Sequence, residues 1–326
     1  MKKYFKYVLI TFLSCIFGII ACTEVQDGYI SDRIMYYANP FIVASGVTTY
    51  SQAPNLGGSS VPVTFEILDV KDANGTSTDE LTKGRRLLMW TSPYNSYTDS
   101  TIELIQAKRT WVEGEPTMRI LERSGQLLFT ESTLECQPGT YSIDMKMSNS
   151  AGERIFNDVL KVTLEDRTSA SGPANWCITD TKGINPDYWT NNPASFEFKH
   201  DPNGPNKIHV RVCDQNGNPF NWKTGEVAKR GSRPCLEFAT PWAETIYTDT
   251  EAIFEYPFTP FPFGPISSED GTWSTDYCYY RIKNDYVAID GYDAQRYYAD
   301  ITFFFYLYRA GEWWVDIKYP TINRVG

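Results

Sequence analysis

The strongest constraint on the fold is a strict two-residue alternation of side chains over residues 298–308. One set of alternate positions is entirely apolar: Ala299, Ile301, Phe303, Phe305 and Leu307. Successive side chains of a β-strand point to opposite faces, so this spacing predicts a strand with one buried face. The alternation resumes over residues 313–318, after a turn at 309–312. We expect these two runs to form a hairpin with a common core face.

Shorter runs of the same kind recur, separated by Gly, Pro, Asn and Asp. The further strands expected are 61–70, 117–121, 126–130, 138–149, 159–164, 195–199, 207–213, 235–238, 252–256 and 277–283. A capping box at Ser100–Glu103 predicts one short helix, and residues 76–100 are expected to form a long loop. Because no long amphipathic helix pattern occurs, the chain is predicted to be all-β.

Aromatic residues divide the chain into two unequal parts. Residues 22–169 contain 13 Phe, Trp and Tyr, whereas residues 170–326 contain 31. Small polar residues at 165–175 are typical of a linker. We therefore expect two β-sandwich domains in tandem, residues 28–168 and an aromatic-rich antiparallel domain at 169–326.

The N-terminus has the features of an export signal. Three lysines precede an apolar stretch at 8–20, which is too short to span a bilayer comfortably. The sequence Ile19-Ile20-Ala21-Cys22 resembles a bacterial lipobox, which implies cleavage after a signal peptide at 1–21 and lipidation of Cys22. Residues 22–27 would then be a lipidated tether. The alternatives are an ordinary signal peptide with an incidental cysteine, or lipidation at Cys15.

Charge and residue types exclude several functions. From Cys22 onward the chain has 27 basic and 40 acidic residues, which argues against nucleic-acid binding. The chain has two histidines and none of the hydrolase or phosphate-loop motifs, so we expect no enzymatic activity, metal or cofactor. A glycosidase, which needs only a pair of carboxylates, is the alternative that the sequence leaves open. Asp-x-Asn-Gly at Asp72, Asp201 and Asp214 indicates turns rather than calcium sites.

Cysteine count bears on cross-linking in the exported chain. After Cys22 five cysteines remain, an odd number, with no CxxC spacing among them. One or two disulfides are possible in an oxidising compartment, but buried free thiols in strands are the favoured interpretation.

Two sequence features carry a family resemblance. The run Pro138-Gly-Thr-Tyr to Asn-Ser-Ala-Gly152, with the strand that follows to 164, resembles the end of PKD-like and immunoglobulin-like modules. Together with the lipobox, the layout resembles Bacteroidetes cell-surface lipoproteins of polysaccharide-utilisation systems. That resemblance implies an outer-membrane protein facing the cell exterior, a spacer-like first domain, and a TonB-dependent transporter and its lipoprotein partner as neighbours.

Aromatic side chains away from the expected core face are the candidate binding residues. Flat rings beside short polar groups suit the apolar face and hydroxyls of a sugar. The candidates are Tyr306, Tyr308 and Trp314 on the outer face of the last strands, and Trp189, Trp222, Trp242 and Trp273 in loop-like segments. These features predict non-catalytic glycan capture. The alternatives are a structural or adhesive lipoprotein that binds another protein, and rings that pack under a loop or against the first domain.

The lipobox interpretation makes a direct prediction about Cys22. In a Cys22→Ala variant expressed in a lipoprotein-processing bacterium, incorporation of labelled fatty acid should be lost, because the acylated thiol is absent. The measurement is radiolabel or click-label on the immunoprecipitated chain. Fatty-acid label that persists in the variant would contradict the assignment of the lipid anchor to Cys22.

Overall fold

The computed structural model describes residues 28–172, 174–190 and 192–326, and β-strand dominates the regular structure of these residues. The predicted all-β class is therefore confirmed. The expected signal peptide, the tether and Cys22 lie outside the described residues. Buried apolar side chains form separate cores before residue 165 and after residue 173, which define an N-terminal and a C-terminal lobe. The proposed domain division at 168–169 falls between these cores.

The N-terminal lobe is built from two facing sheets. The larger has the order β1 (Phe41–Ala44), β9 (Gly152–Glu165), β8 (Gly139–Asn149) and β3 (Thr64–Lys71). The smaller has the order β2 (Thr49–Tyr50), β7 (Leu127–Phe129) and β6 (Met118–Ile120). The alternation in β8 buries Tyr141, Ile143, Met145 and Met147, as expected from the sequence.

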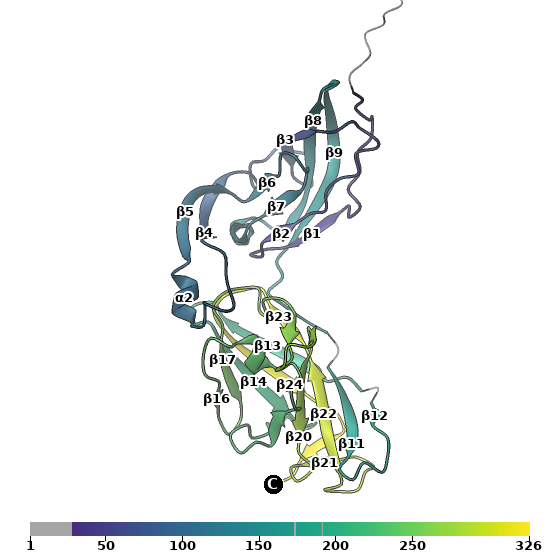
Figure 1. Ribbon diagram of the computed structural model, residues 1–326, viewed down its shortest axis with the longest axis vertical. Coiled ribbons are helices and arrows are strands. Elements are labelled where there is room, and N and C mark those ends of the chain that lie inside the picture. The colour runs from purple at the N-terminus through teal and green to yellow at the C-terminus, as the bar shows by residue number, and fades with distance from the viewer. Residues whose placement is uncertain (1–27, 173, 191) are drawn as a thin grey trace, which may run out of the picture.

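A long arm leaves this lobe and reaches the other one. It consists of β4 (Gly84–Trp90) paired with β5 (Arg109–Pro116), with the helix α2 (Ile102–Gln106) near its tip (Figure 1). The expected helix is present, and Thr101 rather than Ser100 caps it by accepting a bond from the Leu104 N–H. The expected loop at 76–100 is corrected, because β4 lies within it; the strand is stabilised by its long-range partner β5.

The C-terminal lobe packs two five-stranded sheets face to face. The first, called the β22 sheet, has the order β12 (Tyr188–Trp189), β11 (Asn175–Asp180), β22 (Tyr297–Phe303), β20 (Cys278–Ile282) and β15 (Val227–Lys229). The second, called the β24 sheet, has the order β13 (Ser195–Asp201), β24 (Glu312–Lys318), β14 (Lys207–Cys213), β17 (Ala252–Glu255) and β16 (Ile246–Tyr247). Between them lies one core that contains Trp176 and Trp313.

Short elements complete the fold. They are the 3-10 helix η1 (Glu131–Glu135), the helix α3 (Leu236–Ala239), and the strand pairs β10 (Ser169–Ser171) with β23 (Phe305–Leu307), β18 (Ile266–Ser267) with β19 (Ser274–Thr275), and β21 (Val287–Ile289) with β25 (Ile322–Arg324). The expected strand at 235–238 is corrected to α3, since a four-residue apolar run fits either element. No helix in the described part of the chain is long and apolar enough to cross a membrane.

The alternating runs at the C-terminus form different contacts from those expected. The predicted core face at 299–307 is buried, and so are Trp313, Val315 and Ile317. However, β22 and β24 belong to opposite sheets, so the expected hairpin is corrected. Each strand has a continuous apolar face, and the two faces cover one another across the core. In the β24 sheet, β24 lies between β13 and β14 and runs parallel to β14, which departs from the expected antiparallel pattern.

The turns and thiols follow the sequence expectations. The carboxylates of Asp72, Asp201 and Asp214 each accept the backbone N–H two residues later, as turn residues do. The five cysteines of the described chain are free and buried. Burial raises the pKa of Cys213 to about 11, which keeps this thiol protonated and unreactive at neutral pH.

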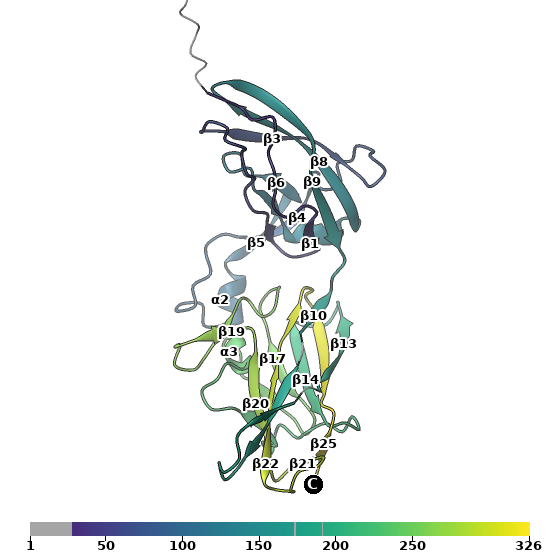
Figure 2. The same cartoon turned by 90° about the vertical axis from the view of Figure 1, so that its right-hand side faces the viewer.

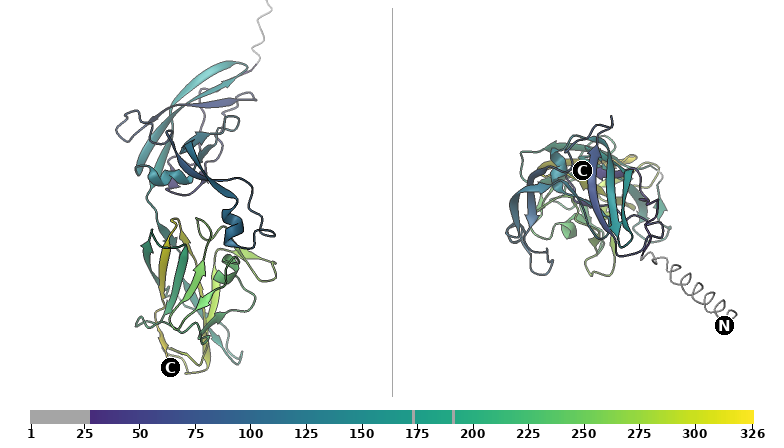
Figure 3. Two further views of the ribbon diagram at one scale, coloured as in Figure 1. Left: turned by 90° about the vertical axis from the view of Figure 1, so that its left-hand side faces the viewer. Right: turned by 90° about the horizontal axis from the view of Figure 1, so that it is seen from above.

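The two lobes are stacked along the long axis of the molecule. The first described residues lie at the end of the N-terminal lobe that is remote from its partner, and the C-terminus lies at the opposite end (Figures 1 and 2). The arm bridges the lobes on one side, and the chain connection at β9 and β10 bridges them on another (Figure 3). The space between the arm and the C-terminal lobe is where the candidate site lies.

The packing of β9 predicts a contrast between two of its aliphatic residues. Leu160 is fully buried, whereas Ile155 on the same strand is 58% exposed. Leu160→Ala should lower the free energy of unfolding by about 2–5 kcal/mol through lost burial and a residual cavity. Ile155→Ala should change it by no more than about 0.5 kcal/mol. Urea titrations followed by circular dichroism measure both, and equal losses would contradict the placement of this strand.

Candidate functional site

A cleft of about 500 Å³ lies between the arm and the C-terminal lobe, within the volume range of small-molecule sites. Its N-terminal wall is formed by one face of the β4–β5 arm and by η1. Its C-terminal wall is formed by the loop at 257–259 and by the residues that follow β23. The lining mixes three aromatic rings with leucines, arginines, glutamates and amides.

An ion pair lies in the N-terminal wall. The Arg109 side chain is 7% exposed, and its Nη2 lies 3.0 Å from one carboxylate oxygen of Glu131 and 3.2 Å from the other. The guanidinium also lies against the Trp90 ring, with 5.2 Å between Cζ and the ring centroid. Its Nε is buried and has no hydrogen-bond partner. A buried donor without a partner is rare in folded proteins and costs about 1–3 kcal/mol.

Burial perturbs the carboxylate of this pair. Desolvation raises the pKa of Glu131 above its ordinary value, and the attraction of Arg109 opposes that shift without cancelling it. Perturbed carboxylates in clefts are typical of functional sites.

Aromatic rings flank the ion pair on both walls. Trp111 is 55% exposed, and Arg86 lies over its ring with Cζ 4.2 Å from the centroid. Tyr308 on the opposite wall stacks parallel to Tyr306, with 6.3 Å between ring centroids. Strand pairing places Trp111 opposite Leu88 on the face of the arm that lines the cleft.

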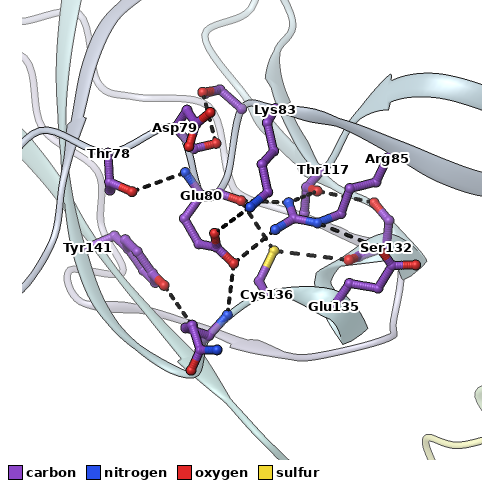
Figure 4. Close-up of polar contacts among 12 residues, drawn as sticks. Thr78, Asp79, Glu80, Lys83, Arg85, Thr117, Ser132, Glu135, Cys136 and Tyr141 are labelled. Atoms are coloured by element: carbon purple, nitrogen blue, oxygen red, sulfur yellow. Dashed lines mark hydrogen bonds and ion pairs between the residues drawn. The ribbon is translucent and has the colours of Figure 1, made fainter.

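A polar network holds η1 and the base of the arm in place (Figure 4). Arg85 of β4 donates to the Glu80 carboxylate at 2.8 Å and to the Thr117 hydroxyl at 2.8 Å. Thr117 in turn accepts a bond from Ser132 of η1. Glu80 also accepts the backbone N–H of Gln137, just beyond η1. Because these bonds tie η1 to β4, they set the position of the Glu131 side chain relative to the arm.

The lobes are joined beside the cleft by a buried arginine. Arg309 donates from Nη1 to the carbonyl oxygen of Ser45 and from Nη2 to Asp166 at 2.8 Å. Gly46 permits this approach, since a Cβ at that position would lie 2.6 Å from Arg309 Nη1 and its φ is +79°. The next residue back, Tyr308, donates its backbone N–H to Thr168 at 2.9 Å. These contacts fix Tyr308 in the wall.

The tip of the arm docks on the C-terminal lobe through aromatic edges. Trp90 and Phe258 meet nearly perpendicularly with centroids 5.4 Å apart. Tyr94 makes similar contacts with Trp242 at 6.2 Å and with Phe263 at 6.0 Å. Trp242, a candidate binding residue from the sequence, therefore packs against the N-terminal lobe.

The structure separates the seven aromatic candidates into five places. Tyr308 lines the cleft with Tyr306 stacked behind it, and Trp242 lies in the docking contact beside it. Trp189 and Trp273 are exposed on the outer side of the β22 sheet. Trp314, on the β24 sheet, lies between the His209 ring at 5.1 Å and the Lys199 ammonium at 4.8 Å. Trp222 is corrected to a core residue, since it is 4% exposed and stacks on Tyr247.

Sequence reasoning missed the N-terminal wall of the cleft. Arg109, Trp111 and Glu131 lie in the aromatic-poor part of the chain, whereas the sequence-based candidates all lie in the aromatic-rich part. The signal available was the presence of two tryptophans, Trp90 and Trp111, in a segment with few other rings.

The raised pKa of Glu131 predicts a pH dependence of stability. The folded state holds a proton that the unfolded state releases, so ionisation of Glu131 destabilises the fold. The free energy of unfolding of the wild-type chain, measured relative to that of Glu131→Gln, should therefore fall as the pH rises above 4.5. The fall should end once the pH has passed the pKa of Glu131 in the folded state. Urea unfolding from pH 4 to 8 measures this, with Glu135→Gln on the same 3-10 helix as the control for charge removal. A wild-type chain that gains stability relative to Glu131→Gln over that range would show that Arg109 outweighs burial.

Comparison with known proteins gives few relatives. No curated protein matches the chain. Among solved structures, a match is BT4661, a SusE-like surface-located polysaccharide-binding protein from the Bacteroides thetaiotaomicron heparin utilisation locus, at 8% identity and a TM-score of 0.26. The match covers 89% of this chain and 53% of that one, so the chain spans about half the length of BT4661.

A family model does match more than half of the sequence. It is described as a domain of unknown function, DUF5007, and it matches residues 55–221. The matched segment begins in the N-terminal lobe before β3, includes the whole arm and η1, and ends in the C-terminal lobe after β14. On this match, the chain belongs to the DUF5007 family.

Proposed function

We propose that the protein is a non-catalytic surface lipoprotein that captures a saccharide in the cleft between its lobes. The observation that carries the proposal is the pairing of an exposed ring, Trp111, with the Arg109–Glu131 ion pair in one wall. A sugar offers an apolar C–H face to such a ring and hydroxyls to the charged pair. Tyr308 faces the same space from the other lobe, so a bound sugar would contact both walls.

The ion pair suits hydroxyl recognition rather than capture of a free charge. Arg109 and Glu131 neutralise one another at 3.0 Å, so a neutral ligand meets no uncompensated charge there. The amides of Gln106 and Asn206 add donors and acceptors from the two lobes. Charged hydrogen bonds to hydroxyls inside a partly enclosed cleft are stronger than the same bonds in water.

The position of the cleft fits display at a membrane surface. If Cys22 is acylated, residues 23–27 allow a reach of at most roughly 3.6 Å per residue between the anchor and the first described residues. The end of the N-terminal lobe at which the described chain begins would then face the membrane, and the cleft would lie beyond that lobe (Figure 1). In this proposal the N-terminal lobe supplies one wall of the cleft and also holds the cleft away from the membrane. An outer-membrane transporter with its own lipoprotein partner receives the saccharide.

The cleft predicts which substitutions weaken capture. Trp111→Ala and Tyr308→Ala should each lower affinity for a bound polysaccharide about tenfold or more, through loss of a stacking surface. Affinity electrophoresis against a panel of soluble polysaccharides, followed by calorimetry on those that bind, provides the measurement. Tyr97→Ala is the matched control, because Tyr97 is 95% exposed and lies outside the cleft.

The possible outcomes separate this proposal from its alternatives. If no polysaccharide binds, saccharide capture is rejected, and a protein partner becomes the leading function. If binding survives both cleft substitutions, the site lies elsewhere. If the protein releases reducing ends from a polysaccharide and Glu131→Gln abolishes that release, the protein is a hydrolase instead of a binding protein.

A further inference from the structure

A second set of functional side chains lies on the outer side of the β22 sheet. One register row crosses all five strands and contains Trp189, Cys177, Asp300, Arg281 and Ala228. Directly opposed residues point to the same side of a sheet. Their chain neighbours Trp176, Ile301 and Ile282 are buried in the core between the sheets, so this row points outward.

A buried carboxylate organises the centre of the row. Asp300 is fully buried and accepts hydrogen bonds from Thr179 Oγ1 at 2.8 Å and from Arg281 Nη2 at 2.8 Å. It also forms an ion pair with Arg230, whose Nη2 lies 2.9 Å away. Arg281 also donates from Nε to the other carboxylate oxygen. One buried acid therefore holds two guanidinium groups side by side.

The two guanidinium groups keep donors for a ligand. Each arginine has five N–H groups, and the bonds to Asp300 use only the Nε and Nη2 positions of Arg281 and the Nη2 position of Arg230. The other acid nearby, Asp187, is half-exposed and 3.9 Å from Arg230, which is a weak exposed pair. A planar guanidinium fork matches the geometry of carboxylate and sulfate oxygens.

Aromatic rings flank the arginines along the sheet. Trp189 on the edge strand is 53% exposed. Tyr298 lies beneath Arg281, with 4.3 Å between Cζ and the ring centroid. Tyr279, one row along β20, contacts Trp273 at 5.6 Å, and Trp273 is 38% exposed. We call Trp189, Arg230, Arg281, Tyr298 and Asp300 the arginine face.

We propose that the arginine face binds an acidic saccharide, whose carboxylate or sulfate lies on Arg230 and Arg281 while an adjoining sugar ring stacks on Trp189. The chain as a whole has a formal charge of −10, so it repels polyanions at long range. Binding must therefore come from the local pair of arginines, and salt should weaken it. None of these residues lines the cleft, so the two sites are separate.

The test compares polymers of different charge on the exported chain. Polygalacturonate, its methyl-esterified form, dextran sulfate and neutral dextran are titrated by calorimetry at low and high salt. We expect polygalacturonate or dextran sulfate to bind, and their uncharged counterparts to bind at least about tenfold more weakly, the difference expected for charge-assisted hydrogen bonds. Comparison of dextran sulfate with polygalacturonate shows whether the arginine face prefers sulfate or carboxylate.

Variants separate recognition from a purely structural role of the cluster. Trp189→Ala leaves the buried Asp300 network intact and should weaken acidic-polymer binding about tenfold through loss of stacking. Asp187→Asn removes the competing acid and should leave binding equal or tighter, an outcome that a structural role does not produce. Arg281→Gln should abolish the difference between charged and neutral polymers, and thermal unfolding checks that this variant is folded.

The outcomes also distinguish this site from the cleft. Trp111→Ala should leave acidic-polymer binding unchanged if the arginine face is the site. Equal binding of charged and uncharged polymers, or full retention in both Trp189→Ala and Arg281→Gln, overturns the proposal. If Trp111→Ala abolishes binding of the acidic polymer and Trp189→Ala does not, the acidic polymer binds in the cleft. That result also overturns the proposal.

Discussion

The contact that fixes the two lobes beside the cleft is centred on one buried guanidinium group, that of Arg309. Its backbone is held in the C-terminal core, since its carbonyl oxygen accepts bonds from Trp313 Nε1 at 3.0 Å and from the Tyr256 hydroxyl. Its side chain ends in the N-terminal lobe on Ser45 and Asp166. A buried cation that loses its partners is strongly destabilising, so this contact favours a single arrangement of the lobes. The cleft exists only in that arrangement, because its walls come from different lobes.

The cleft and the arginine face differ in their electrostatics. In the cleft, Arg109 and Glu131 form a pair with no net charge, set between rings that are partly shielded from water. On the β22 sheet, one buried acid holds two arginines, and the Arg281 side chain is 30% exposed. Short-range hydrogen bonds to neutral groups suit the first arrangement, and salt-sensitive attraction of anions suits the second. The two places therefore favour ligand groups of different charge.

Periodicity predicted which side chains are buried but not which strands pair. The alternation over 299–307 identified the core face, because side-chain spacing sets which side of the strand faces the core. It did not predict that Asp300 and Thr302 on the opposite side are buried as well. The placement of β24 between β13 and β14 depends on contacts over a hundred residues apart, which no local pattern contains. The cleft was missed for the same reason: Arg109 and Tyr308 meet only after the arm has crossed to the other lobe. Local signals did locate the Asp-based turns and the helix α2, since these are set by neighbouring residues.

The insertion of β24 between β13 and β14 has a consequence for the limits of the family. The segment matched by the family model ends at residue 221, so it contains β13 and β14 but not the strand that joins them. A fragment with those limits would leave β13 and β14 with unpaired backbone edges, and the C-terminal core without Trp313. The segment that matches the family model therefore lacks the central strand of the β24 sheet, and an expression fragment should extend at least through β24.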